Sequence, residues 1–290
     1  RSADYVNSEG FIANDDNTMV GGKLVLSYQQ NEDSFWYGSI NRGYKAGGAN
    51  TDGTLPDDLR TFEPEYLLNY ELGYKVALLD NAAFIRSAVF FMDRKDVQVK
   101  SSKTIVREDS SSEFIAYLGN AATGSNMGVE VEANWQINES VELYASLGLL
   151  DTEFNDYIDA QGNSLNDEEQ AHAPNYQFNL GVNIQPSDHW LINVSVDGKD
   201  EFYFSATRYY DGEPIKVDDL KSKSVALINA SLSYLDDDYQ VKVWARNLTD
   251  EDYASRGFYF GNDPRDGYTA KQYTQLAEPL VFGVTLDYQF

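Results

Sequence analysis

Few residues in this chain have the types and spacing that catalysis or metal binding requires. It has two histidines: His172, which closely follows the acidic residues 167–169, and His189, which stands beside Asp188 in a turn-forming stretch. A histidine near several carboxylates could hold a divalent metal, but this spacing matches no known ligand motif. Acidic loop residues are usually solvated, and a histidine beside a turn is usually exposed. We therefore expect no metal site and no bound cofactor.

Paired carboxylates have equally simple structural explanations. Glu130 and Glu132 are two residues apart, so in a strand they share one face, where acid–base chemistry is conceivable but a hydrated wall is simpler. Asp236-Asp237-Asp238 could bind calcium, but these are also ordinary turn residues. The sequence shows no phosphate-binding loop, dinucleotide fingerprint, nucleophile elbow or Ser-His-Asp arrangement. It therefore predicts a protein that is not an enzyme.

Composition excludes further classes of protein. The 290 residues include 22 Lys and Arg against 47 Asp and Glu, for a net charge of −25, which disfavours nucleic acid as a partner. The absence of cysteine excludes disulfide scaffolds, iron–sulfur clusters and thiol nucleophiles. Aromatic residues make up 14% of the chain, which is too many for a disordered protein.

The elements that would position any site are predicted by a repeated alternation of apolar and polar residues. From Tyr176 to Ile184 the even positions are large and apolar, and the odd positions are Gln, Asn or Gly. Alternation with period two indicates strands that have one apolar and one polar face. Eleven such segments can be drawn, at 20–30, 34–46, 65–79, 82–100, 113–137, 140–157, 174–185, 189–207, 223–235, 239–248 and 278–290.

The connections between these segments alternate strictly between short and long. Short turns stand at 31–33, 80–81, 138–139, 186–188 and 236–238, and long connections at 47–64, 101–112, 158–173, 208–222 and 249–277. All short turns should therefore lie at one end of the strands and all long loops at the other, as in antiparallel up-and-down transmembrane β-barrels. The strands are long enough to cross a bilayer, and the last one ends its apolar stripe on Phe290. The alternative is a soluble antiparallel sandwich or barrel with an apolar core.

Several segments then resemble one family, the TonB-dependent outer-membrane receptors of the siderophore-receptor type. The matching segments, in the family's order, are the S-x-x-R-G-Y-K-A-G-G-like stretch at 39–48, the E-x-x-x-x-Y-E-L-G-x-K-like strand at 64–75, the strand at 88–98, the N-A-A and G-V-E-V-E stretches at 120–122 and 128–132, the R-N-L-T-D-E-D-Y stretch at 246–253 and the closing strand at 279–290. Together they run from about residue 20 to the end of the chain.

The resemblance implies a barrel of 22 strands filled by an N-terminal plug, with a TonB box before the plug. Eleven strands are about half of such a barrel. We therefore expect this chain to be a part without the plug, in which 1–19 is the end of an extracellular loop and 20–290 is the C-terminal part of the barrel. Implied partners are the TonB–ExbB–ExbD complex, reached through the absent N-terminal region, the barrel-assembly machinery, outer-membrane lipid and lipopolysaccharide of a Gram-negative cell, and a small-molecule ligand.

The implied function is TonB-energised uptake of a scarce ligand, foremost a ferric siderophore. Arg and Tyr in the long loops suit an anionic, aromatic ferric chelate, through charge-assisted hydrogen bonds and stacking, although loop tyrosines can equally form the aromatic girdle of a barrel. The candidate ligand residues are Arg208, Tyr209, Tyr210, Arg256, Tyr259 and Arg265. The closing strand would carry the barrel-assembly signal in Leu286, Tyr288 and Phe290. The rival functions are a passive outer-membrane porin and a soluble β-rich carbohydrate-binding protein.

Overall fold

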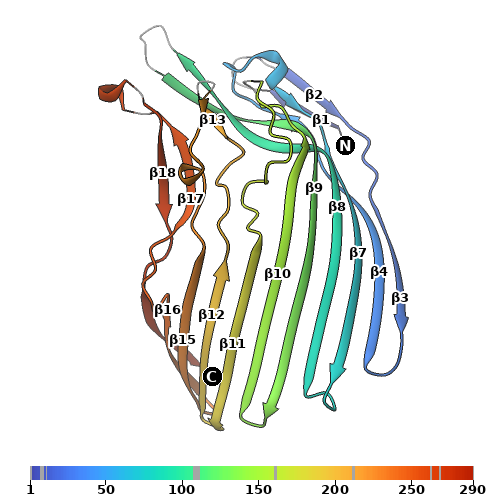
Figure 1. Ribbon diagram of the computed structural model, residues 1–290, viewed down its shortest axis with the longest axis vertical. Coiled ribbons are helices and arrows are strands. Elements are labelled where there is room, and N and C mark those ends of the chain that lie inside the picture. The colour runs from blue at the N-terminus through green and yellow to red at the C-terminus, as the bar shows by residue number, and fades with distance from the viewer. Residues whose placement is uncertain are drawn as a thin grey trace.

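One large antiparallel sheet dominates the chain (Figure 1). The structure, a computed structural model, describes residues 2–6, 10, 12–106, 112–159, 162–210, 213–261, 263–267 and 269–289. In this part of the chain no helix has the length and apolar character needed to cross a membrane.

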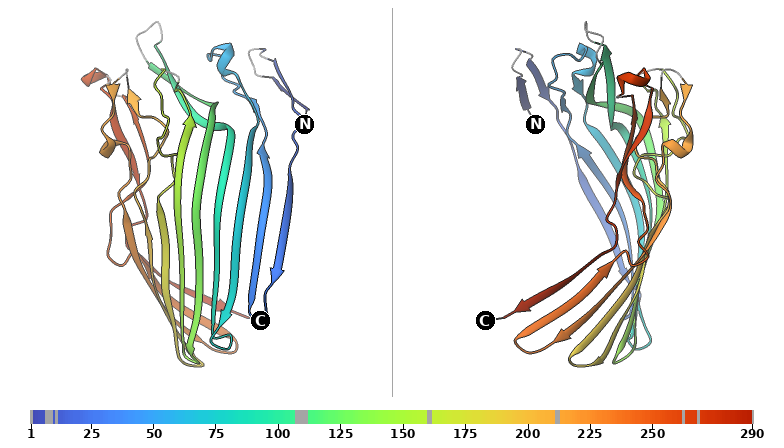
Figure 2. Two further views of the ribbon diagram at one scale, coloured as in Figure 1. Left: turned by 45° about the vertical axis from the view of Figure 1, so that its right-hand side comes forward. Right: turned by 90° about the vertical axis from the view of Figure 1, so that its left-hand side faces the viewer.

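The sheet has eleven strands, each paired with its neighbour in sequence order, and its two edge strands are β3 and β19. They are β3 (Gly22–Gln29), β4 (Ser34–Lys45), β7 (Glu65–Leu78), β8 (Ala83–Val106), β9 (Ser112–Asn138), β10 (Val141–Asp156), β11 (Tyr176–Ser187), β12 (Trp190–Lys199), β15 (Val225–Leu235), β16 (Tyr239–Arg246) and β19 (Val281–Tyr288). The all-β antiparallel fold and all eleven predicted segments are thereby confirmed. The sheet is strongly curved and twisted, so β19 leaves at a steep angle to the first strands (Figure 2).

The smaller elements lie at the end of the sheet that carries the long connections, and the short turns lie at the other end (Figure 1). Four small hairpins form there, made by β1 (Ser2–Val6) with β2 (Ile12–Asp16), β5 (Gly48–Ala49) with β6 (Thr61–Phe62), β13 (Tyr209–Tyr210) with β14 (Glu213–Pro214), and β17 (Ala254–Phe260) with β18 (Lys271–Leu276). Three short 3-10 helices accompany them, η1 (Asp57–Leu59), η2 (Val217–Asp219) and η3 (Pro264–Asp266). We call this the loop end of the sheet.

Two predicted boundaries are wrong. Residues 101–112 do not form a long connection, because the β8–β9 ladder continues until Val106 pairs with Ser112. The polar composition of this stretch suggested a loop, but backbone pairing in a hairpin extends without an apolar face. The predicted strand 189–207 ends early, at Lys199. The Asp200 carboxylate accepts hydrogen bonds there from the Glu201 N–H and the Ser224 hydroxyl, which turns the chain out of the sheet.

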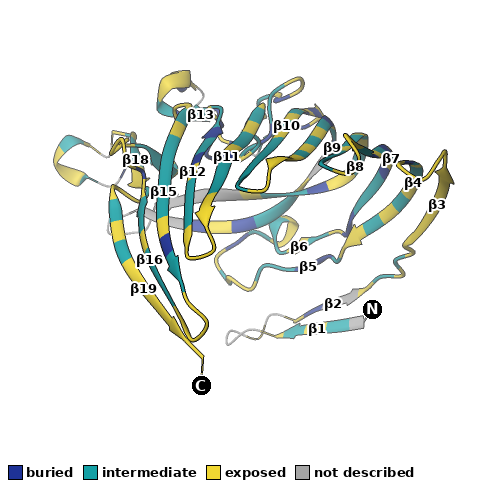
Figure 3. Cartoon of the chain, turned by 90° about the horizontal axis from the view of Figure 1, so that it is seen from below, coloured by how far each residue is buried: buried dark blue, intermediate teal, exposed yellow. Residues whose placement is uncertain are grey.

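One face of the sheet exposes large apolar side chains over many strands. Leu72 is 52% exposed, Val89 is 47% exposed and Leu149 is 45% exposed, although all three lie in the middle of long strands. Seen from below, exposed and partly exposed residues alternate along the strands (Figure 3). The apolar stripes thus lack the protein cover that a soluble sandwich would give them, which counts against that alternative.

The opposite, polar face is organised by hydrogen bonds between side chains of neighbouring strands. Asp197 accepts hydrogen bonds from Asn179 and Asn229, each at 2.6 Å, and Glu142 accepts one from Asn183 at 2.9 Å. Glu132 lies 3.4 Å from Arg86. The carboxylates of this face are therefore components of a polar wall.

Aromatic rings on the polar face lie across glycines of the adjacent strand. The register pairs are Tyr37 with Gly73, Phe90 with Gly128, Tyr144 with Gly181 and Trp244 with Gly283. A Cβ atom added to any of these four glycines would lie 2.1 to 2.5 Å from a ring atom of its partner. Only glycine leaves room for the ring there, so these pairs help to fix strand register.

Candidate ligand-binding site

Three long connections, β10–β11, β12–β15 and β16–β19, pack against one another at the loop end. Two small hydrophobic clusters join them. The first consists of Val97, Phe154, Tyr157, Leu165 and Ala206, with Tyr209 packed against it. The second consists of Tyr203, Ile215 and Leu220, with Tyr210 and Tyr259 packed against it. The loops are therefore built around cores of their own.

Two cations lie over the ring of Tyr203. The guanidinium carbon of Arg208 is 3.4 Å from the ring centroid, and the ammonium nitrogen of Lys221 is 4.3 Å from it. Tyr203 itself is only 8% exposed. Burial strengthens such cation–π contacts. We call these three residues the Tyr203 stack.

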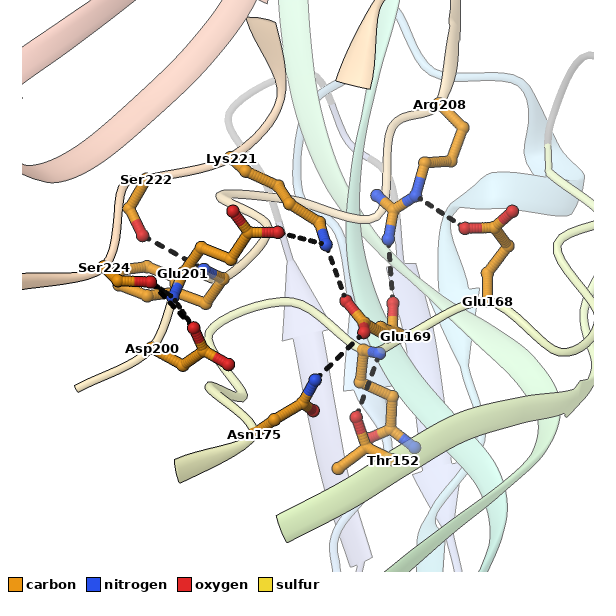
Figure 4. Close-up of polar contacts among 12 residues, drawn as sticks. Thr152, Glu168, Glu169, Asn175, Asp200, Glu201, Arg208, Lys221, Ser222 and Ser224 are labelled. Atoms are coloured by element: carbon orange, nitrogen blue, oxygen red, sulfur yellow. Dashed lines mark hydrogen bonds and ion pairs between the residues drawn. The ribbon is translucent and has the colours of Figure 1, made fainter. Parts of the chain in front are cut away.

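Carboxylates of two loops neutralise the Tyr203 stack (Figure 4). Arg208 Nε lies 3.3 Å from a carboxylate oxygen of Glu168. Lys221 Nζ lies 3.1 Å from carboxylate oxygens of both Glu169 and Glu201. The stack thereby ties the β10–β11 connection to the β12–β15 connection.

The pKa values of the two cations reflect this setting. Burial lowers the pKa of Arg208, and Tyr203 and Glu168 oppose that effect. Burial also acts to lower the pKa of Lys221, but its hydrogen bonds to Glu169 and Glu201 outweigh burial and raise that pKa. Both side chains are therefore charged at neutral pH.

The β10–β11 connection is also anchored to the sheet through Gln170. Arg94 donates a hydrogen bond of 2.8 Å to the side-chain oxygen of Gln170, and its other donors reach Glu65. The Gln170 amide donates in turn to the Glu153 carbonyl at 2.9 Å, and its backbone N–H donates to Thr152. The loop is thus held on β8 and β10.

The structure packs three of the six predicted ligand residues, Tyr209, Tyr210 and Tyr259, against the two clusters, and it places a fourth, Arg208, over the ring of Tyr203. Arg208 is 7% exposed, and its guanidinium also donates to the carbonyls of Ser205 and Glu169, at 2.7 and 2.8 Å. Its donors therefore serve the loops, and a contact with ligand stays a prediction. Tyr210 meets Tyr259 edge-on, with ring centroids 5.9 Å apart.

The other two predicted residues lie apart from these clusters. Arg256 is exposed on β17, and the pKa of His172 is lowered first by burial and then by the charge of Arg256. Arg265 lies in η3, where its 88% exposed side chain pairs with Asp263 at 2.8 Å. Sequence reasoning missed Tyr203. The run Phe202-Tyr203-Phe204 could have revealed it, because three consecutive aromatic residues break the alternation of a strand.

The predicted assembly residues lie on an edge strand. Leu286 and Tyr288 are 67% and 57% exposed, on β19, where they pair with Val241 and Tyr239 of β16. Phe290 lies outside the described residues.

Metal candidates do not assemble into a site. Among the described residues, no three His, Asp or Glu side chains lie close enough together to hold an ion. The His172 ring packs against Phe202, with centroids 5.5 Å apart. His189 lies at a short turn, where its ring stacks on Tyr234 and its Nδ1 contacts the Leu235 carbonyl.

Comparison with known proteins gives the family. Residues 2–248 match the family described as TonB dependent receptor-like, beta-barrel. The pesticin receptor of Yersinia pestis is 24% identical over 254 residues, which cover 86% of this chain and 34% of that protein. This chain thus spans about a third of the length of the curated relatives it matches.

Two solved structures share the fold. The ferric yersiniabactin uptake receptor FyuA of Yersinia pestis aligns with a TM-score of 0.72 and 23% identity, over 97% of this chain and 38% of its own. The siderophore receptor PiuA of Acinetobacter baumannii aligns with a TM-score of 0.70 and 16% identity, over 96% of this chain and 36% of its own. The eleven-stranded sheet thus matches a portion of these barrels, and the chain belongs to the TonB-dependent receptors, a family of outer-membrane transporters that are not enzymes.

Proposed function

We propose that this chain is the loop-bearing barrel wall of a receptor that takes up a ferric siderophore across the outer membrane of a Gram-negative cell. The observation that carries this proposal is the asymmetry of the sheet. Tight turns close one end, whereas at the other end three long connections share apolar clusters and buried cations. Such ordered loops suit ligand capture from one side of a membrane.

The names of similar proteins support the choice of ligand. FyuA is a ferric yersiniabactin uptake receptor and PiuA is a siderophore receptor. Both are less than 25% identical to this chain, so the likeness shows a shared fold, and we propose the ligand class.

The two faces of the sheet fit a barrel wall. We assign the exposed apolar face, with Leu72, Val89 and Leu149, to lipid. We assign the polar face, with its hydrogen-bonded Asp197 and Glu142, to the interior of the barrel. In this proposal a plug fills the interior, the TonB–ExbB–ExbD complex supplies energy through it, the barrel-assembly machinery inserts the chain, and lipopolysaccharide surrounds the loops.

Growth on single iron sources tests the proposal. Cells that carry or lack the complete gene are compared on one ferric siderophore at a time, with soluble iron as the control medium. We expect loss of growth on at least one siderophore and unchanged growth on soluble iron. If the deletion strain grows on every siderophore that supports the parent, the proposal of siderophore uptake is wrong. Uptake that depends only on solute size would instead indicate a passive porin.

A further inference from the structure

The β8–β9 hairpin changes direction where it leaves the sheet. The ladder between its strands is continuous except at Asp96, which is left unpaired between Lys95 and Val97 and has a φ of +54°. That left-handed conformation does not occur in a regular strand, so the hairpin bends there. Beyond Asp96 it turns across the loop end, and seen from below it lies inside the curve of the sheet (Figures 1 and 3).

Polar side chains of the hairpin fix this bend and join it to the β4–β7 connection. The Asn120 amide donates hydrogen bonds to the Asp96 carbonyl at 2.7 Å and to the Glu63 carbonyl at 3.0 Å. Its side-chain oxygen accepts a hydrogen bond of 2.8 Å from the Glu63 N–H. The Gln98 amide donates to the Ala46 carbonyl at 2.9 Å. The two ends of the β4–β7 connection are therefore hydrogen bonded to the hairpin.

A third hydrophobic cluster lies at the same junction. It consists of Leu55 of the β4–β7 connection and Ile115 and Tyr117 of the hairpin, with Leu59 packed against it. Leu55 is only 2% exposed, and among the described residues of its connection it is the one buried apolar side chain. The Asn50 amide also donates to the Leu118 carbonyl at 2.8 Å, and the Leu118 N–H donates to the Asn50 side-chain oxygen at 2.9 Å. The β4–β7 connection is thus buried against the hairpin.

The hairpin also belongs to the first cluster. Val97 is one of its members, and Val99 packs against it. The other members come from β10, from the β10–β11 connection and, through Ala206, from the β12–β15 connection. A cavity of about 250 Å³ lies between residues of the first and third clusters, and it is lined by Leu59, Val99, Tyr117 and Tyr157 among others. The hairpin itself therefore links the two clusters.

The β16–β19 connection joins this series through the second cluster. Tyr259 of β17 packs against that cluster, whose buried members all come from the β12–β15 connection. β17 also lies close to Phe204, because a Cβ atom added to Gly257 would lie 2.4 Å from a ring atom of Phe204. The ion pairs of the Tyr203 stack connect β10–β11 with β12–β15. Four long connections and the hairpin thus form an unbroken series of contacts.

These segments depend on one another for burial. The three hydrophobic clusters found among the described residues all lie at the loop end, and each includes or contacts side chains of two segments or more. When one segment opens, apolar side chains of its neighbour become exposed to water, which is unfavourable. Segments that share buried surface in this way open together.

We propose that the four long connections and the β8–β9 hairpin open as a single cooperative unit, in which the hairpin joins the β4–β7 connection to the other three. The loop end is then a preformed structure, and a molecule that arrives there meets loops that are already ordered. The inference goes beyond the proposed uptake function and holds for any ligand.

Hydrogen exchange of the full-length receptor in detergent, without ligand, tests this unit. Both variants change the β4–β7 connection. L55A removes the buried leucine side chain, and N50A removes the side-chain hydrogen bonds of Asn50 while it leaves the third cluster intact. The matched control is L79A, which removes the same side chain from a 63% exposed leucine in a short turn at the other end of the sheet.

The reporting amides lie in the three other connections, where each donates to a carbonyl of its own connection. They are the N–H groups of Leu165, Ile215 and Ala277, which donate to Tyr157, Arg208 and Tyr253, each at 2.9 Å. The local reporter is the N–H of residue 50, which donates to the Arg60 carbonyl at 2.8 Å.

We expect L55A to accelerate exchange at residue 50 by about thirty-fold, the lower end of the range for loss of a buried leucine side chain, and to accelerate it by a similar factor at the three distant amides. N50A should do the same by about ten-fold, and it carries the test if L55A does not fold. Amides of β11 should keep their rates in both variants, and L79A should exchange like the parent at every reporter.

Acceleration confined to residue 50 would show that the connections open independently and would overturn the unit. Equal acceleration in β11 would overturn it as well, because the sheet would then open together with the loops. An unchanged rate at residue 50 in both variants would show that the hairpin does not hold the β4–β7 connection. Because the measurement uses no ligand, none of these outcomes decides whether the proposed uptake function is right.

Discussion

Replacement of Arg208 by methionine, R208M, is expected to release the two loops that the Tyr203 stack holds together. The variant loses the charged hydrogen bonds to the carbonyls of Ser205 and Glu169, a longer one to the Thr207 carbonyl, and the contact with the Tyr203 ring. The ion pair with Glu168 adds little, because that carboxylate is 43% exposed. Hydrogen bonds from a buried charged group and a desolvated cation–π contact together stabilise the loops by about 4 kcal/mol.

Hydrogen exchange on the full-length receptor in detergent measures this effect. The backbone N–H of His172 donates to the Tyr203 carbonyl at 2.9 Å, and that of Ile215 donates to the Arg208 carbonyl at 2.9 Å, so both amides report on loop opening. A loss of about 4 kcal/mol corresponds to an increase of roughly three orders of magnitude in the opening equilibrium. Exchange at these amides should accelerate toward that limit, while amides of β11 stay protected.

The matched control is R265M, because the Arg265 side chain is exposed and pairs only with Asp263. It should exchange like the parent at His172 and Ile215. If R208M exchanges like the parent while its affinity for a ferric chelate falls, Arg208 contacts ligand and our structural interpretation of it is wrong.

Three further predictions concern the wall, the loops and the apolar face. Gly181→Val places a side chain where a tyrosine ring lies 2.2 Å from an added Cβ, and it should lower barrel stability by about 1–3 kcal/mol in heat-modifiability assays. Gly148→Ala should have no such effect, because an added Cβ there meets nothing within 4 Å. Equal effects of the two variants would show that the rings do not require glycine opposite them. The pKa of His172 is lowered in the folded state, so its contribution to loop stability is present above its unfolded pKa and is lost as pH falls through its folded pKa. H172Q should therefore flatten the pH dependence of amide exchange in the loops, and H189Q should leave it unchanged. A pH dependence that H172Q does not alter would refute this. Leu72→Arg puts a charge on the face assigned to lipid and should lower the stability of the inserted barrel by about 2–4 kcal/mol near the bilayer centre. We expect less folded receptor in outer-membrane fractions. An unchanged amount of folded receptor would argue against the assignment of this face to lipid.

The sequence predicted the sheet well because its signal is periodic and local. Alternation from Tyr176 to Ile184 and the turn at 186–188 place β11 and β12 within a few residues. The β8–β9 extension was missed because the pairing of a hairpin needs only backbone groups, and residues 101–106 show little alternation. The early end of β12 was missed because it depends on a hydrogen bond between Asp200 and Ser224, which are 24 residues apart.

The candidate site was predicted only in part, for a similar reason. Arginine and tyrosine in loops suggested a ligand, but residue type does not say whether a guanidinium is free. Arg208 is covered by Tyr203 and by carbonyls from two loops, and those contacts arise only in the fold. Tyr203 was assigned to a strand, and its contacts with Arg208 and Lys221 become visible only in the folded connection that follows β12.

Accumulation of radiolabelled iron by cells shows whether the protein is an energised receptor. Cells expressing the complete gene receive one ferric siderophore that supports their growth, with TonB present or deleted. We expect rapid accumulation that is lost without TonB, while the receptor still binds the chelate at the surface. Equal accumulation with and without TonB would show that uptake is not energised by TonB.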